Sequence, residues 1–347
     1  MMSPIQQEDY QSLLNQTEIE WNQLQGKTFL ITGSTGLIGS NLVYMLLYAN
    51  DHAQLNSKLV LLVRNESRAQ ELFGMRPDIT YLETDVQIPF SIEGNIDYII
   101  HAASQTSSQQ FINQPVETLQ IAYQGTKNIL DFARAKQVKK IIYLSSMEVY
   151  GTPQKGHTIT ENEIAGFDTT TVRNSYPISK LACEALCSAY HSEYRVPSII
   201  LRLTQTFGPG VKYNDGRVFA QFMSCALEQQ DIVLKTAGQT ERCYLYTSDA
   251  ISAILIALTK AVPGEAYTVA NPTTYCSIWE MADLVANQVC NGKIKVVVDI
   301  SANISSLGYA DTLYMQLDTQ KMNALGWQPK VDLKDMYTRM ILSFQRQ

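Results

Sequence analysis

Two side chains in the stretch YPISK, Tyr176 and Lys180, stand four residues apart and could together move a proton. In a helix this spacing puts both on one face, one turn apart. An ammonium beside a phenol lowers the pKa of the phenol, and the phenolate can then accept a proton from a substrate hydroxyl. The spacing alone is frequent by chance. It gains weight because about thirty residues earlier the apolar stretch KKIIYLSSMEVYG ends in Ser145 and Ser146, followed by Glu148. The two serine hydroxyls could hold a hydroxyl or keto group.

A glycine-rich loop, TGSTGLIGS, follows the apolar stretch KTFLITG near the N-terminus and opens a helical pattern, GLIGSNLVYMLLYA. Its glycines, Gly33, Gly36 and Gly39, permit a tight turn and a close approach of the backbone to a ligand. A pyrophosphate can then bind at the N-terminus of the helix. A glycine triplet alone is a weak signal. At a strand-to-helix junction it predicts a dinucleotide site.

The residues at the end of the next apolar stretch, KLVLLVRN, should determine whether NAD or NADP is preferred. A site for NAD normally has a carboxylate there that accepts the ribose 2′-hydroxyl. This chain has Arg64 instead, with Arg68 close behind, and an arginine suits the 2′-phosphate of NADP. Arg64 could equally stack over the adenine of NAD, so both cofactors stay open. Asp85, after the third strand, is placed to bind the adenine amino group. An aspartate that only forms a turn would give the same sequence pattern.

The elements that must position these residues alternate between strand and helix. Apolar strands without polar alternation, separated by helices, predict a parallel sheet that is covered on both faces. The fold class is therefore α/β, a Rossmann doubly wound parallel sheet with a smaller C-terminal lobe. We expect a helical extension over 1–25, the Rossmann domain over 26–205 with a return at 232–260, and the smaller lobe over 206–231 and 261–347. The strands are predicted at 27–33, 58–65, 79–86, 96–104, 139–146 and 197–204, one helix at 8–24, and two long helices at 115–136 and 175–194.

Composition narrows the class of protein. The chain has 347 residues, 45% of them hydrophobic and 17% charged, which is typical of a soluble globular protein. Its net charge of −6 argues against nucleic acid or an anionic membrane as partner. The polar, acidic N-terminus differs from a signal peptide. The six cysteines show no metal spacing, and a reducing cytoplasm is expected. Cys183 and Cys187, four apart on a predicted helix, are expected to be small buried thiols. No metal site is predicted.

Seven motifs, in order along the chain, resemble those of the extended short-chain dehydrogenase/reductase family: TGSTGLIGS, HAAS, SSMEVYG, YPISK, RLTQTFGP, ERCYLYTSD and DTQKMNALGWQP. The resemblance runs from about residue 26 to the C-terminus. It implies a nicotinamide cofactor, a lobe for a nucleotide sugar and commonly a homodimer. Tyr176 would be the catalytic base, Lys180 its partner that also holds the nicotinamide ribose, and Ser146 the hydroxyl that orients the substrate. Further contacts to the cofactor would come from Thr35, Leu37, Ile38, Val86, Ala102, Ala103 and Ser104.

The same resemblance suggests which sugar chemistry to expect, because these enzymes all first oxidise the sugar at C4. Dehydratases have an acid and Glu at the strand end, whereas this chain has Met147, and a thioether donates no proton. Epimerases usually have a small or apolar residue in place of Glu148. SSMEVYG is most similar to the motif of the members that decarboxylate UDP-glucuronate. Arg173, three residues before Tyr176, could pair with a sugar carboxylate, and Arg242 matches an arginine that those members use near the substrate.

Some residues depart from that pattern or have simpler interpretations. Gln205 stands where the family has Asn, and HAASQTSS lacks a proline pair. Glu148 could cap the following turn, Arg173 could lie on the surface, and Arg242 could form a salt bridge between lobes. A 4-epimerase, a 4,6-dehydratase or a non-catalytic NAD(P)-sensing scaffold therefore stay open as alternatives. The expected substrate ligands are Arg173, Gln205, Arg217 and Arg242.

Overall fold

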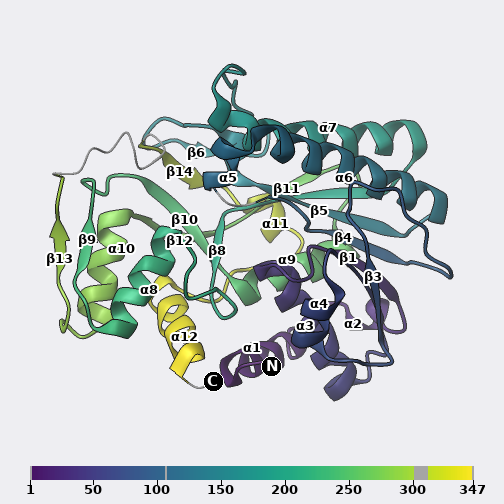
Figure 1. Ribbon diagram of the computed structural model, residues 1–347, viewed down its shortest axis with the longest axis horizontal. Coiled ribbons are helices and arrows are strands. Elements are labelled where there is room, and N and C mark those ends of the chain that lie inside the picture. The colour runs from purple at the N-terminus through teal and green to yellow at the C-terminus, as the bar shows by residue number, and fades with distance from the viewer. Residues whose placement is uncertain (1, 106–107, 301–311, 346–347) are drawn as a thin grey trace.

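The computed structural model describes residues 2–105, 108–300 and 312–345. Its largest element is a seven-stranded sheet with the order β11-β7-β5-β4-β1-β2-β3, in which every neighbouring pair is parallel (Figure 1). This confirms the predicted Rossmann sheet. The strands are β1 Thr28–Thr32, β2 Lys58–Val63, β3 Ile79–Glu83, β4 Tyr98–His101, β5 Lys140–Ser146, β7 Ser198–Leu203 and β11 Ala266–Val269.

Helices cover both faces of this sheet because its central strands are apolar on both sides. Successive residues of β1 show the alternation: Phe29 and Ile31 belong to the core cluster with α3 and α9, whereas Leu30 packs into the cluster with α6 and α7. The carboxyl ends of the strands thus lie between two helical layers. The covering helices are α3 Leu37–Ala53, α4 Glu66–Phe73, α6 Pro115–Lys136, α7 Ser175–Tyr194 and α9 Thr247–Lys260.

Much of the remaining chain forms a smaller lobe around a second hydrophobic core, in which Phe207, Phe219, Tyr244 and Tyr337 pack together. One sheet has the order β12-β10-β14-β6, with β8 paired to β10, and a second contains β13 and β9. The strands are β6 Thr158–Ile159, β8 Gln205–Phe207, β9 Ile232–Leu234, β10 Glu241–Tyr246, β12 Asn271–Ser277, β13 Val296–Val298 and β14 Tyr314–Leu317. The remaining helices are α5 Ser108–Asn113, η1 Met147–Tyr150, η2 Val172–Asn174, α8 Val218–Glu228, α10 Ile278–Leu284, η3 Val285–Val289, α11 Gln320–Asn323 and α12 Leu333–Gln345. Of these, α5 contacts α6, and α11 contacts β11 of the main sheet.

Several strands pair differently from the expected division into lobes. The strand β11 lies within 261–347, which the sequence assigned to the smaller lobe, but it extends the main sheet beside β7. Conversely, β9 and β10 lie within 232–260 and belong to the smaller sheets, so that only α9 returns to the main sheet. These strands have only three to six residues, and tertiary contacts decide which strands they pair with. Their sequence patterns therefore do not indicate to which sheet they belong.

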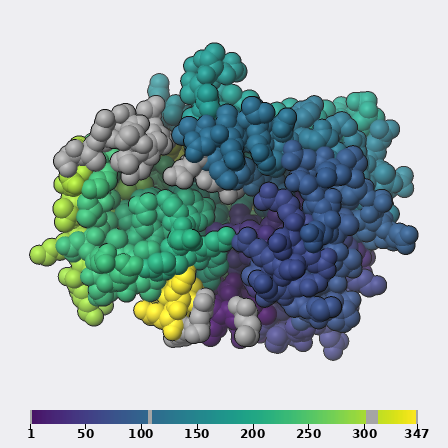
Figure 2. Space-filling model, viewed as in Figure 1, coloured from purple at the N-terminus to yellow at the C-terminus, as the bar shows by residue number. Residues whose placement is uncertain are grey.

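The N-terminal segment forms two helices instead of the single one expected over 8–24. The helix α1, Pro4–Leu14, begins at Ser3, which makes a capping box with Gln6, and α2 covers Trp21–Leu24. The cap sets the start of α1 earlier than the apolar pattern suggests. In Figure 2 these purple residues appear between the yellow C-terminal helix and the blue residues of the main-sheet half.

All six cysteines are free thiols, and Cys183 and Cys187 are buried, as the sequence predicts. Within the described residues, the search for a helix with the length and apolar character to cross a membrane finds none.

Candidate active site

The glycine-rich loop joins β1 to α3 as expected. Gly33 has a φ of +66°, and a Cβ there would lie 2.6 Å from the carbonyl carbon of Ala102. A Cβ on Gly39 would collide with the backbone oxygen of Gly33. Neither position therefore tolerates a side chain, since the atoms in the way belong to the backbone. Gly36 is the N-cap of α3, followed by Leu37 and Ile38 in its first turn.

The loop also contains a residue that the sequence analysis did not single out. The hydroxyl of Ser34 is buried and has no hydrogen-bond partner. An unpaired buried hydroxyl beside backbone amides at the start of a helix fits the phosphates of a dinucleotide. Its position between Gly33 and Gly36 was the signal that could have identified it, as it could for the neighbouring Thr35.

The segment after β4 lies against this loop. His101 connects three elements: its Nδ1 is 2.8 Å from the Thr32 hydroxyl and its Nε2 is 3.1 Å from that of Thr126. Burial lowers the pKa of His101 to about 3, so that the ring is neutral at physiological pH. The Ala103 amide also donates to the Thr32 hydroxyl, which fixes the backbone of Ala102, Ala103 and Ser104 beside the glycines.

The residues expected around the adenosine lie at the ends of β2 and β3. Arg64 is exposed, so its side chain can approach either a 2′-phosphate or an adenine ring. Asp85 accepts the amide of Gln87 at 2.8 Å and thus also forms a turn, the second interpretation considered above. Val86 is buried, and its carbonyl accepts the side-chain amide of Asn128 on α6.

The expected proton-transfer residues meet at the start of α7. Burial raises the pKa of Tyr176, and the negative charge of Glu148 adds to this; a hydrogen bond with Ser146 and the positive charges of Arg173 and Arg217 oppose it. Lys180 Nζ lies 5.8 Å from the centre of the Tyr176 ring and donates to the carbonyl of Leu144 at 2.8 Å. Burial lowers the pKa of Lys180 to about 8. Ser146 and Tyr176 are thus in contact, and the effect of Lys180 on the phenol stays a prediction.

Glu148 and Arg173 form an ion pair 3.0 Å long at the edge of this cluster. The partner of the Glu148 carboxylate is thus an arginine, rather than the following turn. The guanidinium of Arg173 lies 5.1 Å from the ring centre of Phe111, and that ring stacks on Tyr176 with centres 4.2 Å apart and planes 10° from parallel. The sequence analysis missed Phe111 on the short helix α5, because a single aromatic residue has no distinctive spacing.

Two neighbours of Ser146 are directed away from this cluster. The expectation that Ser145 holds a substrate group is wrong for this structure, because its hydroxyl donates to the buried carboxylate of Glu184 at 2.5 Å. Adjacent residues of a strand point to opposite faces, so only one of the two serines can face the site. Met147 is buried, and its sulfur accepts a hydrogen bond from Thr204.

Two expected substrate ligands of the smaller lobe, Gln205 and Arg242, lie on the paired strands β8 and β10. Arg242 Nη1 is 3.5 Å from the side-chain oxygen of Gln205, and the Nε of Arg242 is buried without a partner. Arg217 precedes α8 and forms an ion pair with Asp215 at 2.6 Å. An unpaired guanidinium nitrogen beside an amide is suited to an anionic or polar ligand.

Comparison with known proteins identifies the family. Residues 29–270 match the NAD dependent epimerase/dehydratase family, which is more than half of the chain. The chain belongs to this family. It is therefore an enzyme that uses a nicotinamide cofactor, consistent with the loop around Gly33 and the unpaired hydroxyl of Ser34.

Individual relatives fit this assignment. UDP-glucuronic acid decarboxylase 1 of Xenopus tropicalis is 29% identical over 328 residues, covering 92% of this chain and 73% of that protein. An epimerase from Methanothermobacter thermautotrophicus has a similar structure, with a TM-score of 0.79 and 23% identity over 95% of this chain and 96% of the other. The structure of a dTDP-glucose 4,6-dehydratase from Streptomyces venezuelae, solved with NAD, matches with a TM-score of 0.76 and 22% sequence identity. The match covers 92% of this chain and 97% of the dehydratase chain. The structural matches establish the fold.

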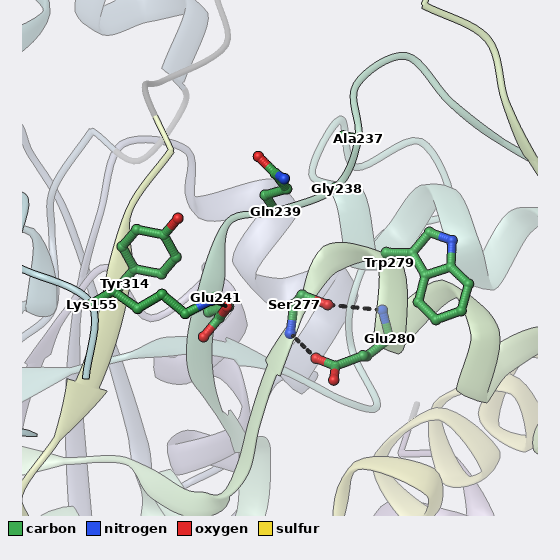
Figure 3. A pocket seen from close by; sticks show the side chains of 9 residues that line it. All are labelled: Lys155, Ala237, Gly238, Gln239, Glu241, Ser277, Trp279, Glu280 and Tyr314. Carbon is green, nitrogen blue, oxygen red and sulfur yellow. Dashed lines mark hydrogen bonds and ion pairs between the residues drawn. The ribbon is translucent and has the colours of Figure 1, made fainter.

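This epimerase/dehydratase family member also has a cavity of about 310 Å³ outside the cluster around Tyr176 (Figure 3). Glu241 lines it, one residue before Arg242 on β10, so the two side chains point to opposite sides of the strand. None of the expected site residues lines this cavity. Its lining residues are Lys155, Ala237, Gly238, Gln239, Glu241, Ser277, Trp279, Glu280 and Tyr314.

Proposed function

We propose that this protein decarboxylates UDP-glucuronate by transient oxidation of the sugar at C4. The observation that carries the proposal is the ion pair between Arg173 and Glu148, placed beside Tyr176 and Ser146. It provides one cation for a substrate carboxylate and one carboxylate for a later proton transfer. Relatives named UDP-glucuronic acid decarboxylase, 26–29% identical to this chain, support the same substrate.

The first step needs a base at the sugar C4 hydroxyl. Ser146 orients this hydroxyl, and Tyr176 accepts its proton as the phenolate, the form that the Lys180 ammonium is expected to favour. A bound nicotinamide cofactor would supply the acceptor for the hydride of C4 and its later return. The glycine loop would hold this cofactor, and Lys180 would bind its ribose. The oxidised sugar is a β-keto acid, whose C5–carboxylate bond breaks so that the electron pair passes into the C4 carbonyl as CO₂ leaves.

Arg173 and Glu148 have complementary roles in the second step. A substrate carboxylate is a rival partner for the Arg173 guanidinium, which binds carboxylates in a planar, two-point arrangement. Binding of the substrate would thus release the Glu148 carboxylate from its ion pair. The released Glu148 carboxylate then takes a proton from solvent and passes it to C5 of the enolate, and Arg242 of the smaller lobe stabilises the negative charge of the enolate. Met147 has no proton to donate, which disfavours dehydration.

Incubation with a panel of nucleotide sugars and NAD or NADP, followed by mass spectrometry, tests the function. We expect loss of CO₂ from UDP-glucuronate and no change in UDP-glucose. Loss of water from a nucleotide hexose would instead show a dehydratase, and inversion at C4 without a change in mass would show a 4-epimerase. A protein that binds the cofactor but converts none of these sugars would support the sensing scaffold.

Replacing Glu148 by Gln is expected to slow the overall reaction by about 10²-fold, because the group that supplies the proton after CO₂ loss is gone. Cofactor affinity should change little, since Glu148 contacts Arg173 and not the glycine loop. Quenched-flow measurement of reduced cofactor and released CO₂ separates the oxidation from later steps. Glu193→Gln, at the exposed end of α7, is the matched control. A Glu148→Gln variant that oxidises and protonates at unchanged rates would refute this role.

A further inference from the structure

The helix α1 lies outside the part of the chain that matches the family, yet it contacts both halves of the molecule. In Figure 1 it lies between α3, which begins at the glycine loop, and α12 of the smaller lobe. It also packs against α9. Its inner face consists of buried residues at helical spacing: Ile5, Gln6, Asp9, Tyr10 and Leu13. The polar members of this face make specific bonds in two directions.

The first set of bonds connects α1 to the cofactor helix. Tyr10 donates its hydroxyl to the side-chain oxygen of Asn41 at 2.8 Å, and Gln6 donates to the same oxygen at 3.1 Å. Asn41 in turn donates to the carbonyl of Leu37, the first residue of α3, at 2.8 Å and to that of Pro209 at 3.2 Å. One buried amide thus joins α1, the start of α3 and the segment that follows β8.

The second set connects α1 to the smaller lobe through a buried carboxylate. Asp9 accepts the hydroxyl of Tyr246 at 2.7 Å and forms an ion pair with Arg339 on α12 at 2.8 Å. Tyr246 is the last residue of β10 and is fully buried. A buried carboxylate with these two partners fixes the three elements relative to each other, because its charge is costly to leave unpaired.

These two sets of bonds hold the ends of the two strands that carry expected substrate ligands. Gln205 begins β8, and the bonded carbonyl of Pro209 follows the end of that strand. Arg242 lies near the start of β10, which ends at Tyr246. The strands are paired, with Phe207 opposite Tyr246. Anchoring both carboxyl ends on one helix leaves little freedom for the strands to shift relative to α3.

We propose that α1 is a strut that fixes β8 and β10 on the cofactor helix α3, and so positions Arg242 and Gln205 for the substrate. The N-terminal helix is then a positioning element of the enzyme, although it contributes no catalytic residue. The consequence for substrate binding rests on the proposed function, because it takes Arg242 as a substrate ligand. The mechanical part rests on the bonds of Asp9, Tyr10 and Gln6 alone.

Hydrogen exchange tests the mechanical part without any substrate. In Asp9→Asn, we expect the amides of β8 and β10 to exchange at least about tenfold faster, because a buried ion pair is broken and local opening becomes easier. Amides of β2 and β3, far from α1, should be unchanged. Gln7→Ala, on the exposed face of the same helix, is the control. Tyr246→Phe, which removes only one hydroxyl, gives the same readout if Asp9→Asn does not fold. Faster exchange confined to α1, or equal acceleration throughout the protein, would overturn the strut.

A double-mutant cycle tests the consequence for the substrate. UDP-glucuronate binding is measured by calorimetry in a Tyr176→Phe background, where turnover is expected to be slow. Asp9→Asn should weaken binding at least about fivefold when Arg242 is intact. In the Arg242→Gln background the same substitution should weaken binding less than about twofold, because Asp9 acts through Arg242. Equal weakening in both backgrounds would overturn positioning through Arg242. Binding that is insensitive to Arg242→Gln, together with faster exchange in β8 and β10, would contradict the proposed function while the strut stands.

Discussion

Replacing Tyr176 by phenylalanine is expected to lower turnover of UDP-glucuronate by about 10²–10⁴-fold, the range for loss of a general base. The ring, its stacking on Phe111 and its burial are retained, so the change removes only the hydroxyl that contacts Ser146. Cofactor affinity should stay within about twofold, since no bond of the glycine loop involves this hydroxyl. Steady-state rates and fluorescence titration with reduced cofactor measure the two effects separately.

Tyr190→Phe is a matched control for this experiment. It removes a phenol from the same helix, four turns further on, whose hydroxyl donates to Asp131. We expect its turnover to equal that of the unmodified protein. If Tyr176→Phe kept more than about a tenth of the activity, another group would have to accept the C4 proton, and the role of Tyr176 would be refuted.

The features that the sequence predicted well are those with a local pattern. The loop with Gly33 and Gly39 sits at a strand-to-helix junction, and its backbone geometry excludes any other residue at either position. Tyr176 and Lys180 share a helical face because of their spacing. The parallel sheet follows from apolar strands that alternate with helices. In each case, residues close in sequence determine the structure.

The features that the sequence could not predict depend on partners far along the chain. Ser145 and Ser146 have the same chemistry, and only the position of Glu184 on α7 decides which of them turns away from the site. The ion pair of Glu148 with Arg173 and the ring of Phe111 over Tyr176 likewise join separate short helices and α7. The expected N-terminal helix had no assigned use, because Asp9 meets Arg339 across almost the whole chain.

Beneath the candidate site, Glu184 and Arg202 form an ion pair 2.7 Å long with only 6% and 5% of each residue exposed. It connects α7, one turn after Lys180, to β7, and the Ser145 hydroxyl at the end of β5 donates to the same carboxylate. Arg202 also donates to the hydroxyl of Tyr150 and to the carbonyl of Glu161. Three elements that position Tyr176, Lys180 and Ser146 are thus joined at one buried charge pair.

Arg202→Met is therefore expected to lower the free energy of unfolding by about 3–5 kcal/mol, because it leaves Glu184 charged and unpaired in the interior. Urea denaturation followed by circular dichroism measures this loss. Glu265→Gln removes a partner from the exposed pair with Lys321 and should cost less than about 1 kcal/mol. Adding Glu184→Leu to Arg202→Met should restore much of the stability, because no buried charge then remains. A double variant no more stable than Arg202→Met would mean that the hydrogen bonds to Ser145, Tyr150 and Glu161, rather than the unpaired charge, hold these elements together.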